Sequence, residues 1–241
     1  MILKVEDLSI KIQRETILKD LTFNIEKGVI TGLLGANGAG KTTTFHALIG
    51  LLPVSCGKIY FMGEDITHLP MYKRGQKGMG YLSQEPSIFK ELTVEENLLL
   101  PLEMKRISSK EKKQIVEESL NELHITHLKK KRADRISGGE RRRVEISRSL
   151  ITNPKILFLD EPFANIDPKT IEDVKGLILF LKNKGISVVS TDHNAKELLS
   201  FIDRGLFLHD GQLLAQGTKE GLLHHPALIE HYLGKSFSLH I

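Results

Sequence analysis

The chain has 241 residues, of which 40% are hydrophobic, 34 are Lys or Arg and 30 are Asp or Glu, which leaves a formal net charge of +4. This length and apolar content suffice for a large buried core, whereas the charge is too mild for the concentrated basic surface typical of nucleic-acid-binding proteins. The lone cysteine, Cys56, excludes an internal disulfide and a zinc site built from cysteines, so we expect a reducing, cytoplasmic compartment.

The apolar runs of the chain are short. The start, MILKVEDLSI, carries an acidic residue early, and runs such as LLLPL and GLILFL fall far short of the roughly 18 residues that a membrane span needs. We therefore expect a protein that is not exported, does not span a membrane and reaches a membrane surface only through a partner.

Residues 1–30 alternate apolar and polar positions around turn-like breaks, a pattern that predicts short, half-exposed antiparallel strands. Residues 29–35, VITGLLG, instead form a continuous apolar run that ends in glycine, which is typical of a strand buried on both faces of a parallel sheet. We expect a helix to follow from Lys41 to about Leu51, and residues 57–63 to form a further strand.

Residues 91–150 have a helical pattern. Ser108 and Glu111 are spaced as a capping box, and apolar residues after them recur on one helical face. This segment predicts a helical layer inserted into the sheet-forming part of the chain.

The last part of the chain returns to strands. Buried strands are predicted at 156–160 and 186–191, with a helix between them, so that two βα units contribute to one sheet. Residues 204–217 predict a hairpin that turns at Asp210 and Gly211. A short helix and a tail are expected to follow.

The sequence GANGAGKT follows one of these buried strands and precedes a helix, which is the context that a phosphate-binding loop requires. Glycines let backbone N–H groups turn inward around phosphate oxygens, Lys41 is suited to reach the β and γ phosphates, and the Thr42 hydroxyl is suited to bind Mg²⁺. The competing interpretation is a glycine-rich turn with a solvated lysine. The predicted nucleotide-binding residues are Gly35, Ala36, Asn37, Gly38, Ala39, Gly40, Lys41, Thr42 and Thr43.

The sequence ILFLDEP places Asp160 and Glu161 at the end of a buried strand, where ligands bind in open α/β sheets. Asp160 is suited to hold Mg²⁺, and Glu161 is suited to deprotonate the water that attacks the γ-phosphate. Taken alone, the pair fits equally well the acidic first turn of a helix. The phosphate loop upstream favours the catalytic interpretation.

Two further polar residues follow predicted strands. His193 comes after 186–191, at the same edge of the sheet, where it can contact the γ-phosphate, and Gln84 can place its amide oxygen near Mg²⁺. A single histidine or glutamine in a loop is more often structural or merely exposed. Their position after strands is what distinguishes them.

Together, GANGAGKT, Gln84, ISGGE, ILFLDEP, NID and His193 stand in the order of the ATP-binding cassette family, and the chain resembles that family over essentially its whole length. The resemblance implies one α/β domain over residues 1–241, with a P-loop NTPase (RecA-like) core of mainly parallel sheet, an N-terminal antiparallel β subdomain and an inserted α-helical subdomain at about 91–150. It also implies ATP and Mg²⁺ as cofactors and a homodimer in which each copy completes the other's site. The residues implied to face the partner's ATP are Ser137, Gly138, Gly139, Glu140 and Asp167.

Within that family, stretches such as LSQEPSIFKELTVEEN, SGGERRRVEI and YLGKSFSL resemble the ATPase subunits of lipopolysaccharide exporters of Gram-negative bacteria. This resemblance implies a homodimer bound to two integral membrane permease subunits at the cytoplasmic face of the inner membrane, with no nucleic-acid partner. Phe89 would then receive a helix of the membrane subunit in a groove, although an ordinary buried phenylalanine is equally compatible with the sequence. Competing functions are those of an ATPase subunit of a branched-chain amino acid importer, a soluble cassette ATPase and a nucleotide-binding protein without turnover.

The chain departs from the family pattern at a few positions. Ile12 stands where an adenine-stacking aromatic is usual, and Phe23 alternates as a core residue instead. Glu140 stands where many members carry glutamine, and Asn165 replaces a small residue. The arginines that follow ISGGE are expected to form a solvated face or salt-bridging surface: Arg141, Arg142, Arg143 and Arg148.

Overall fold

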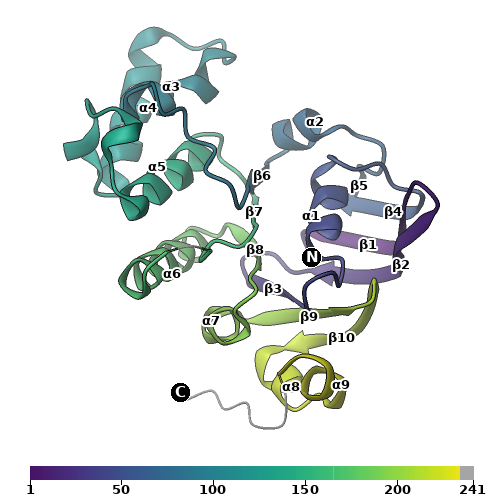
Figure 1. Ribbon diagram of the computed structural model, residues 1–241. Coiled ribbons are helices and arrows are strands. Elements are labelled where there is room, and N and C mark those ends of the chain that lie inside the picture. The colour runs from purple at the N-terminus through teal and green to yellow at the C-terminus, as the bar shows by residue number, and fades with distance from the viewer. Residues whose placement is uncertain (165, 234–241) are drawn as a thin grey trace.

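Two β-sheets and a layer of helices make up the protein, in a computed structural model that describes residues 1–164 and 166–233 (Figure 1). Asn165 and the expected tail from Gly234 lie outside the described residues. The predicted α/β fold, with a mainly parallel sheet, an antiparallel sheet and helices, is confirmed.

The first sheet is antiparallel and has the strand order β2-β1-β4-β5. The alternation predicted within residues 1–30 is present, since Leu3 and Val5 are fully buried beside the more exposed Lys4. The strand expected near 57–63 belongs to this sheet and not to the parallel one, because it pairs antiparallel with the first strand. Its members are β1 (Leu3–Ile12), β2 (Glu15–Ile25), β4 (Cys56–Phe61) and β5 (Glu64–Asp65).

The second sheet has the strand order β10-β9-β3-β8-β7-β6, and its strands are parallel except for β10 at one edge. Every residue of β3, β7 and β8 is buried, as their continuous apolar runs predict. The hairpin at Asp210 and Gly211 joins β9 to β10 as expected. The members are β3 (Ile30–Leu34), β6 (Met79–Leu82), β7 (Ile156–Leu159), β8 (Ser187–Thr191), β9 (Arg204–His209) and β10 (Gln212–Thr218).

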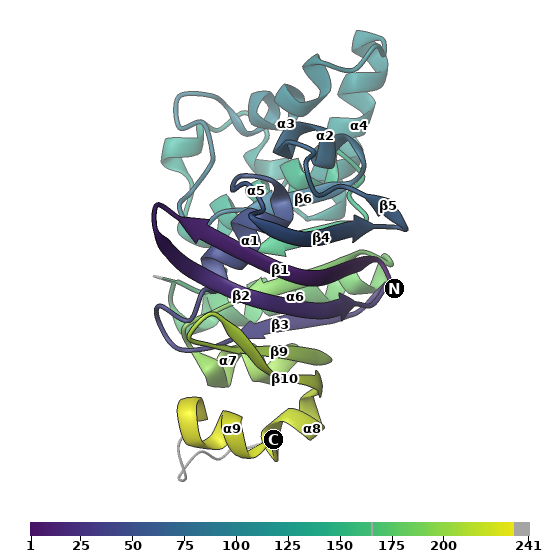
Figure 2. The same ribbon diagram turned by 90° about the vertical axis from the view of Figure 1, so that its right-hand side faces the viewer.

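Helices cover both faces of this second sheet. Helix α1 lies between the two sheets, where Phe45 packs edge-on against Phe158 at 5.4 Å, and Figure 2 views it behind the antiparallel sheet. It ends at Ile49, because Gly50 adopts the left-handed conformation and closes the last turn. The helices outside the helical layer are α1 (Lys41–Ile49), α2 (Met71–Gln76), α6 (Pro168–Asn183), α7 (Ala195–Phe201), α8 (Lys219–Leu223) and α9 (Pro226–Leu228), with a π-helical turn at Ile229–Leu233.

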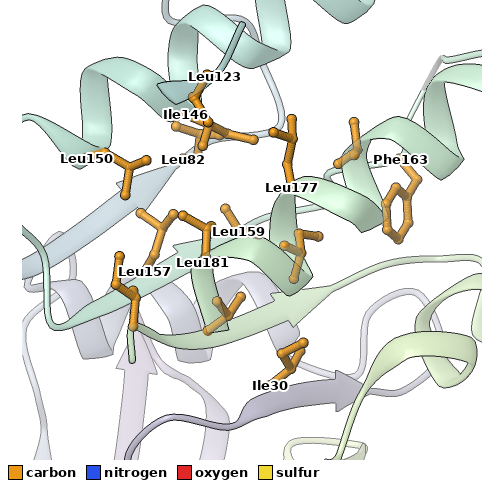
Figure 3. Close-up of a cluster of buried hydrophobic side chains, with 14 of the residues drawn as sticks. Ile30, Leu82, Leu123, Ile146, Leu150, Leu157, Leu159, Phe163, Leu177 and Leu181 are labelled. Carbon is orange, nitrogen blue, oxygen red and sulfur yellow. The ribbon is translucent and has the colours of Figure 1, made fainter. Parts of the chain in front are cut away.

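The helical layer contains α3 (Val94–Glu103), α4 (Ser109–Glu122) and α5 (Gly138–Leu150), joined by short turns at Thr126–Leu128 and Ala133–Arg135. The predicted capping box of Ser108 and Glu111 begins α4. Leu123, Ile146 and Leu150 of this layer share one core with Leu157 and Leu181 from the sheet side (Figure 3). Among residues 1–164 and 166–233, no helix combines the length and apolar character needed to cross a membrane.

Candidate nucleotide-binding and hydrolysis site

The phosphate loop joins β3 to α1 at the carboxyl edge of the parallel sheet. Gly40 has a φ of 100° and comes directly before the helix, where a side chain would lie 2.6 Å from Leu18. At Gly35 an added Cβ would lie 2.5 Å from the Leu208 carbonyl oxygen. Both positions require glycine, because a β-carbon would be strained and would collide with neighbouring chain. Within the loop Ala36, Asn37 and Gly38 are exposed and Ala39 is buried.

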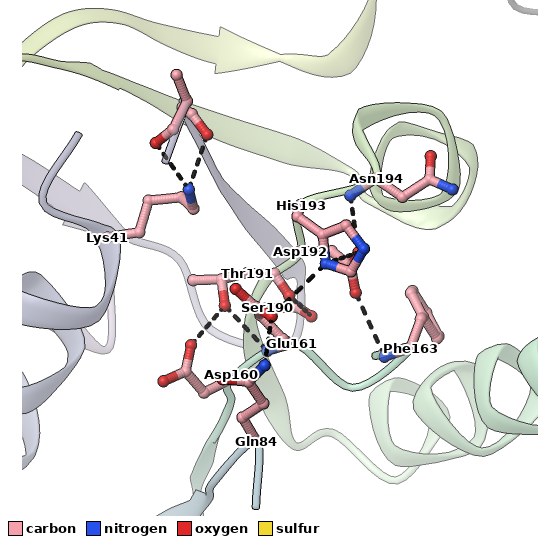
Figure 4. A network of polar contacts seen from close by, with 12 residues as sticks. Lys41, Gln84, Asp160, Glu161, Phe163, Ser190, Thr191, Asp192, His193 and Asn194 are labelled. Atoms are coloured by element: carbon pink, nitrogen blue, oxygen red, sulfur yellow. Dashed lines mark hydrogen bonds and ion pairs between the residues drawn. The ribbon is translucent and has the colours of Figure 1, made fainter. Parts of the chain in front are cut away.

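Lys41 folds back over this loop and is only 7% exposed. Its ammonium donates hydrogen bonds to the carbonyl oxygens of Gly35 at 2.8 Å and Ala36 at 3.0 Å (Figure 4). Burial lowers the pKa of Lys41, an effect that the nearby carboxylates of Glu161 and Asp160 oppose. The next residues, Thr42 and Thr43, are exposed and half-buried respectively. The arrangement places one cation beside the N–H groups of the first turn of α1, which lack carbonyl partners within the helix, and this suits a polyphosphate.

Asp160 follows β7 and is 5% exposed. The Thr191 hydroxyl donates to its Oδ1 at 2.7 Å, and the Tyr81 hydroxyl lies 3.4 Å from its Oδ2. Burial, together with the Asp160 charge, raises the pKa of Tyr81 to about 12, so this hydroxyl stays protonated and is able to donate. Asp160 is therefore held rigidly at the edge of the sheet, on the strand beside β8.

Glu161, Gln84 and His193 come together although they are far apart in the sequence. The Gln84 Nε2 donates to Glu161 Oε2 at 2.8 Å, and the His193 Nδ1 lies 3.5 Å from the same oxygen. This leaves the Gln84 amide oxygen directed elsewhere and available as a ligand. The structure thus brings the three predicted catalytic side chains to one place, near Lys41 (Figure 4).

The oxygens of this edge suit a hard divalent cation. The predicted Mg²⁺ ligands are the Thr42 hydroxyl, the Gln84 amide oxygen and the Asp160 carboxylate, and all three come from the carboxyl edge of the parallel sheet. Across residues 1–164 and 166–233, no group of three His, Cys, Asp or Glu side chains forms a cage for a metal. Such a donor set fits Mg²⁺, which binds through one or two carboxylates plus substrate phosphates, better than a cation that needs an all-protein cage.

A second candidate surface lies at the start of α5. Ser137 caps this helix in a capping box with Glu140, whose carboxylate accepts the Ser137 N–H at 2.8 Å and so has a lowered pKa. A pocket of about 320 Å³ opens beside it, lined by Gly138, Gly139 and Asp167 among others. Asp167 caps the neighbouring α6 by accepting the Thr170 N–H at 3.1 Å. Ser137, Gly138, Gly139, Glu140 and Asp167 therefore share one pocket, as their predicted common role requires.

The arginines of α5 do not form a solvated face, because Arg141, Arg143 and Arg148 are half-buried and Arg142 is buried. The salt-bridging alternative fits better, since Arg143 lies 3.6 Å from Asp173. Arg142 is 9% exposed, and its Nη1 lies 3.2 Å from Glu145, which is itself 3% exposed. Glu145 also accepts the Ser87 N–H at 2.7 Å. The α5 helix packs against the loop that carries Gln84, so this face is buried, and the bond from the Ser87 N–H to Glu145 ties the two segments together.

Phe89 and Ile12 both lie on the surface. Phe89 is 54% exposed, so the interpretation as an ordinary buried phenylalanine is wrong, and the Arg148 guanidinium sits over its ring at 5.7 Å. Ile12 ends β1 and is 42% exposed, whereas Phe23 is 2% exposed in the core as expected.

Sequence reasoning missed Thr191, Asp192 and Tyr81, whose side chains contact the acidic pair or the segment after it. Thr191 and Asp192 come directly before His193, and Tyr81 lies on the strand before Gln84. A search for hydroxyls and carboxylates at the same strand ends would have found them, because parallel strand ends meet at one edge.

Comparison with known proteins agrees with this geometry. Residues 18–164 match the ABC transporter family. The chain is 42% identical to the lipopolysaccharide export system ATP-binding protein LptB of Haemophilus influenzae over 99% of both chains. It is also 42% identical to LptB of Escherichia coli K12, over 92% of this chain and 93% of that protein.

Solved structures resemble it as well. The ADP conformation of MJ1267, an ATP-binding cassette of an ABC transporter, superimposes with a TM-score of 0.86 at 31% identity, covering 97% of this chain and 99% of that one. The family match spans more than half of the chain and includes the phosphate loop and the Asp160–Glu161 pair. The chain therefore belongs to the ABC transporter family, as one of its ATP-binding and ATP-hydrolysing subunits.

Proposed function

We propose that this subunit powers lipopolysaccharide export, binding ATP as a homodimer and hydrolysing it to drive lipopolysaccharide from the inner membrane toward the outer membrane. The observation that carries the proposal is the 42% identity to an LptB protein over 99% of both chains. The proposal treats residues 1–241 as one cassette, in which the segment at about 91–150 is the inserted helical part.

The sheet edge supplies the chemistry. Lys41 and the loop N–H groups bind the β and γ phosphates, and Glu161 accepts the proton of the attacking water. Gln84 and His193 hold the Glu161 carboxylate from two sides, at 2.8 Å and 3.5 Å, and His193 also faces the γ-phosphate. Thr42, Gln84 and Asp160 would hold Mg²⁺, which would neutralise charge on the phosphates.

The pocket at the start of α5, which we call the signature pocket, is lined by Ser137, Gly138, Gly139, Glu140 and Asp167 among others. In this proposal it supplies the second half of each site. Ser137, Gly138 and Gly139 begin α5, and an N-terminal helix turn attracts an anion. Lys41 of the same chain is not among the residues that line this pocket. The γ-phosphate of the partner's ATP is the ligand we assign to this pocket, with Asp167 crossing the interface.

Membrane subunits are the proposed partners, and contact with the inner membrane occurs through them at its cytoplasmic face. Phe89 is the proposed anchor, because a large apolar side chain that is 54% exposed beside Arg148 offers both apolar and cationic contacts. Two integral permease subunits per homodimer would match the two copies of this surface.

The test is to purify the tagged protein from detergent-solubilised membranes and to identify the copurifying proteins by mass spectrometry. Permease subunits of a lipopolysaccharide exporter are the expected result, and Phe89→Ala should weaken their recovery while ATPase activity without them is retained. Leu214→Ala is the matched control, because Leu214 is an apolar side chain, 36% exposed, on β10. Recovery of an amino acid permease, or of nucleic acid alone, would contradict the proposal.

A further inference from the structure

The backbone at Glu161 adopts an unusual conformation. Its φ is 46°, in the left-handed region that a residue other than glycine rarely adopts, and the Ala164 N–H donates to the Glu161 carbonyl at 3.1 Å to close a turn. Such a conformation costs about 1–3 kcal/mol and persists only where neighbouring groups hold it. The groups that hold this turn come from the end of β8.

The Thr191 hydroxyl makes two hydrogen bonds to the acidic pair. It accepts the Glu161 N–H at 3.1 Å and donates to Asp160 Oδ1 at 2.7 Å. Thr191 is fully buried, so no water competes for either bond. One hydroxyl thereby fixes both the backbone of Glu161 and the carboxylate of Asp160.

The Asp192 carboxylate holds the other side of the turn. Its Oδ2 accepts the Phe163 N–H at 3.3 Å, and its Oδ1 accepts the Asn194 N–H at 2.8 Å (Figure 4). Asp192 is 0% exposed, and burial raises its pKa. A carboxylate buried here ties the segment after Glu161 to the segment that carries His193.

We propose that Thr191 and Asp192 are positioning residues for hydrolysis, which hold the left-handed turn at Glu161 so that its carboxylate meets Gln84 and His193. This rests on the proposed role of Glu161 as the base. The geometry of a general base matters strongly, since a displacement of about 1 Å lowers a rate by roughly 100-fold. Loss of this clamp, by which we mean the hydrogen bonds of Thr191 and Asp192 to the acidic pair and the turn at Glu161, should therefore lower kcat and leave ATP binding almost unchanged.

The test replaces Thr191 with valine, which has the same shape without the hydroxyl, and with serine, which keeps it. We expect Thr191→Val to lower the single-turnover rate by about 10- to 100-fold with the Kd for ATP within about threefold of the parent, and Thr191→Ser to recover most of the rate. Thr31→Val is the matched control, because Thr31 is 2% exposed on the neighbouring β3 and its hydroxyl has no hydrogen-bond partner among the described residues. A rate for Thr191→Val equal to that of the control would overturn the proposal.

A double-mutant cycle separates positioning from general structural damage. In the Glu161→Gln protein, Thr191→Val should lower the residual rate much less than in the parent, because the base is already gone and only the bond to Asp160 remains to be lost. A full additional loss in that background would show that Thr191 acts elsewhere. If Glu161→Gln itself hydrolyses ATP at the parental rate, the assignment of the base fails together with the clamp, and that result differs from a failure of Thr191 alone.

A second variant guards against misfolding of the first. Asp192→Asn keeps one carbonyl acceptor and replaces the other with an amide that is unable to accept the second N–H. We expect a kcat about 10-fold lower with KM unchanged, and a thermal transition showing that the protein is folded. An unchanged kcat would remove Asp192 from the clamp.

Discussion

The sheet edge around Lys41 and the helix start at Ser137 differ in how completely one chain satisfies them. Lys41 donates to two carbonyl oxygens, and Asp160 is fixed by the Thr191 hydroxyl. Among the residues that the structure describes, the Ser137 hydroxyl bonds only to the Glu140 N–H of its own helix cap, and it faces a pocket of about 320 Å³. The side chains of the sheet edge are therefore held by other groups of the same chain, whereas the start of α5 presents a hydroxyl to an open pocket.

The largest expected effect concerns the sheet edge alone. Glu161→Gln removes the base but keeps a side chain of the same shape beside Gln84, so hydrolysis should fall by about 10²- to 10⁴-fold while ATP still binds. An ATP-bound dimer should then accumulate on gel filtration. Parental turnover would show that Glu161 is not the catalytic base. The absence of a dimer would show that bound ATP does not join two copies.

The contact between α5 and the loop that carries Gln84 should show the next largest effect. Glu145 is 3% exposed and pairs with Arg142, so Glu145→Ala leaves a buried guanidinium without its partner and should lower the free energy of unfolding by about 3–5 kcal/mol. Urea unfolding measures this change. Glu91→Ala is the control, since its ion pair with Arg132 is on the surface, and it should leave the transition midpoint in place. Equal midpoints for both variants would show that the buried pair of Arg142 and Glu145 contributes no stability.

The contact between adenine and Ile12 is expected to contribute little to the binding of ATP. Ile12 is 42% exposed and lacks a ring, so Ile12→Tyr should add about 1–3 kcal/mol of stacking and lower the Kd for ATP. Titration calorimetry compares the variant with Ile12→Val, which lacks a ring too. An unchanged Kd for Ile12→Tyr would place adenine away from this residue.

The smallest effect concerns the free energy of burying the Lys41 ammonium at the sheet edge. Burial lowers the pKa of Lys41 below 10.5, so the unfolded chain holds this proton more tightly than the folded one. The protonated Lys41 therefore lowers the free energy of unfolding at neutral pH. This penalty disappears as the pH rises through the pKa of Lys41 in the folded protein toward 10.5. Lys41→Met should raise the melting temperature of the nucleotide-free protein by a few degrees at pH 7 and abolish its stabilisation by ATP. A lower melting temperature would contradict this.

Periodicity and motif spacing predicted most of the fold and the places of the phosphate loop and the acidic pair, whereas the roles expected of Ser137 and Asp167 came from the family resemblance. The buried strands and the loop at Gly35 to Thr42 follow from continuous apolar runs and glycine positions, which are local signals. The buried state of Arg142 does not, because it depends on the packing of α5 against the loop of Gln84. The sequence places Thr191 and Asp192 at this same sheet edge, but it does not identify the N–H groups that they bind, because those depend on the order of the strands in the sheet.

Mixing two inactive proteins tests most directly whether each site is shared between two copies. Lys41→Ala damages the sheet edge and Ser137→Ala damages the signature, so a heterodimer of the two contains one intact composite site. Random pairing in an equal mixture should restore about a quarter of the parental sites, and ATPase activity should rise well above that of either variant. Activity no higher than that of the separate variants, with heterodimers demonstrated by differential tags, would contradict the account.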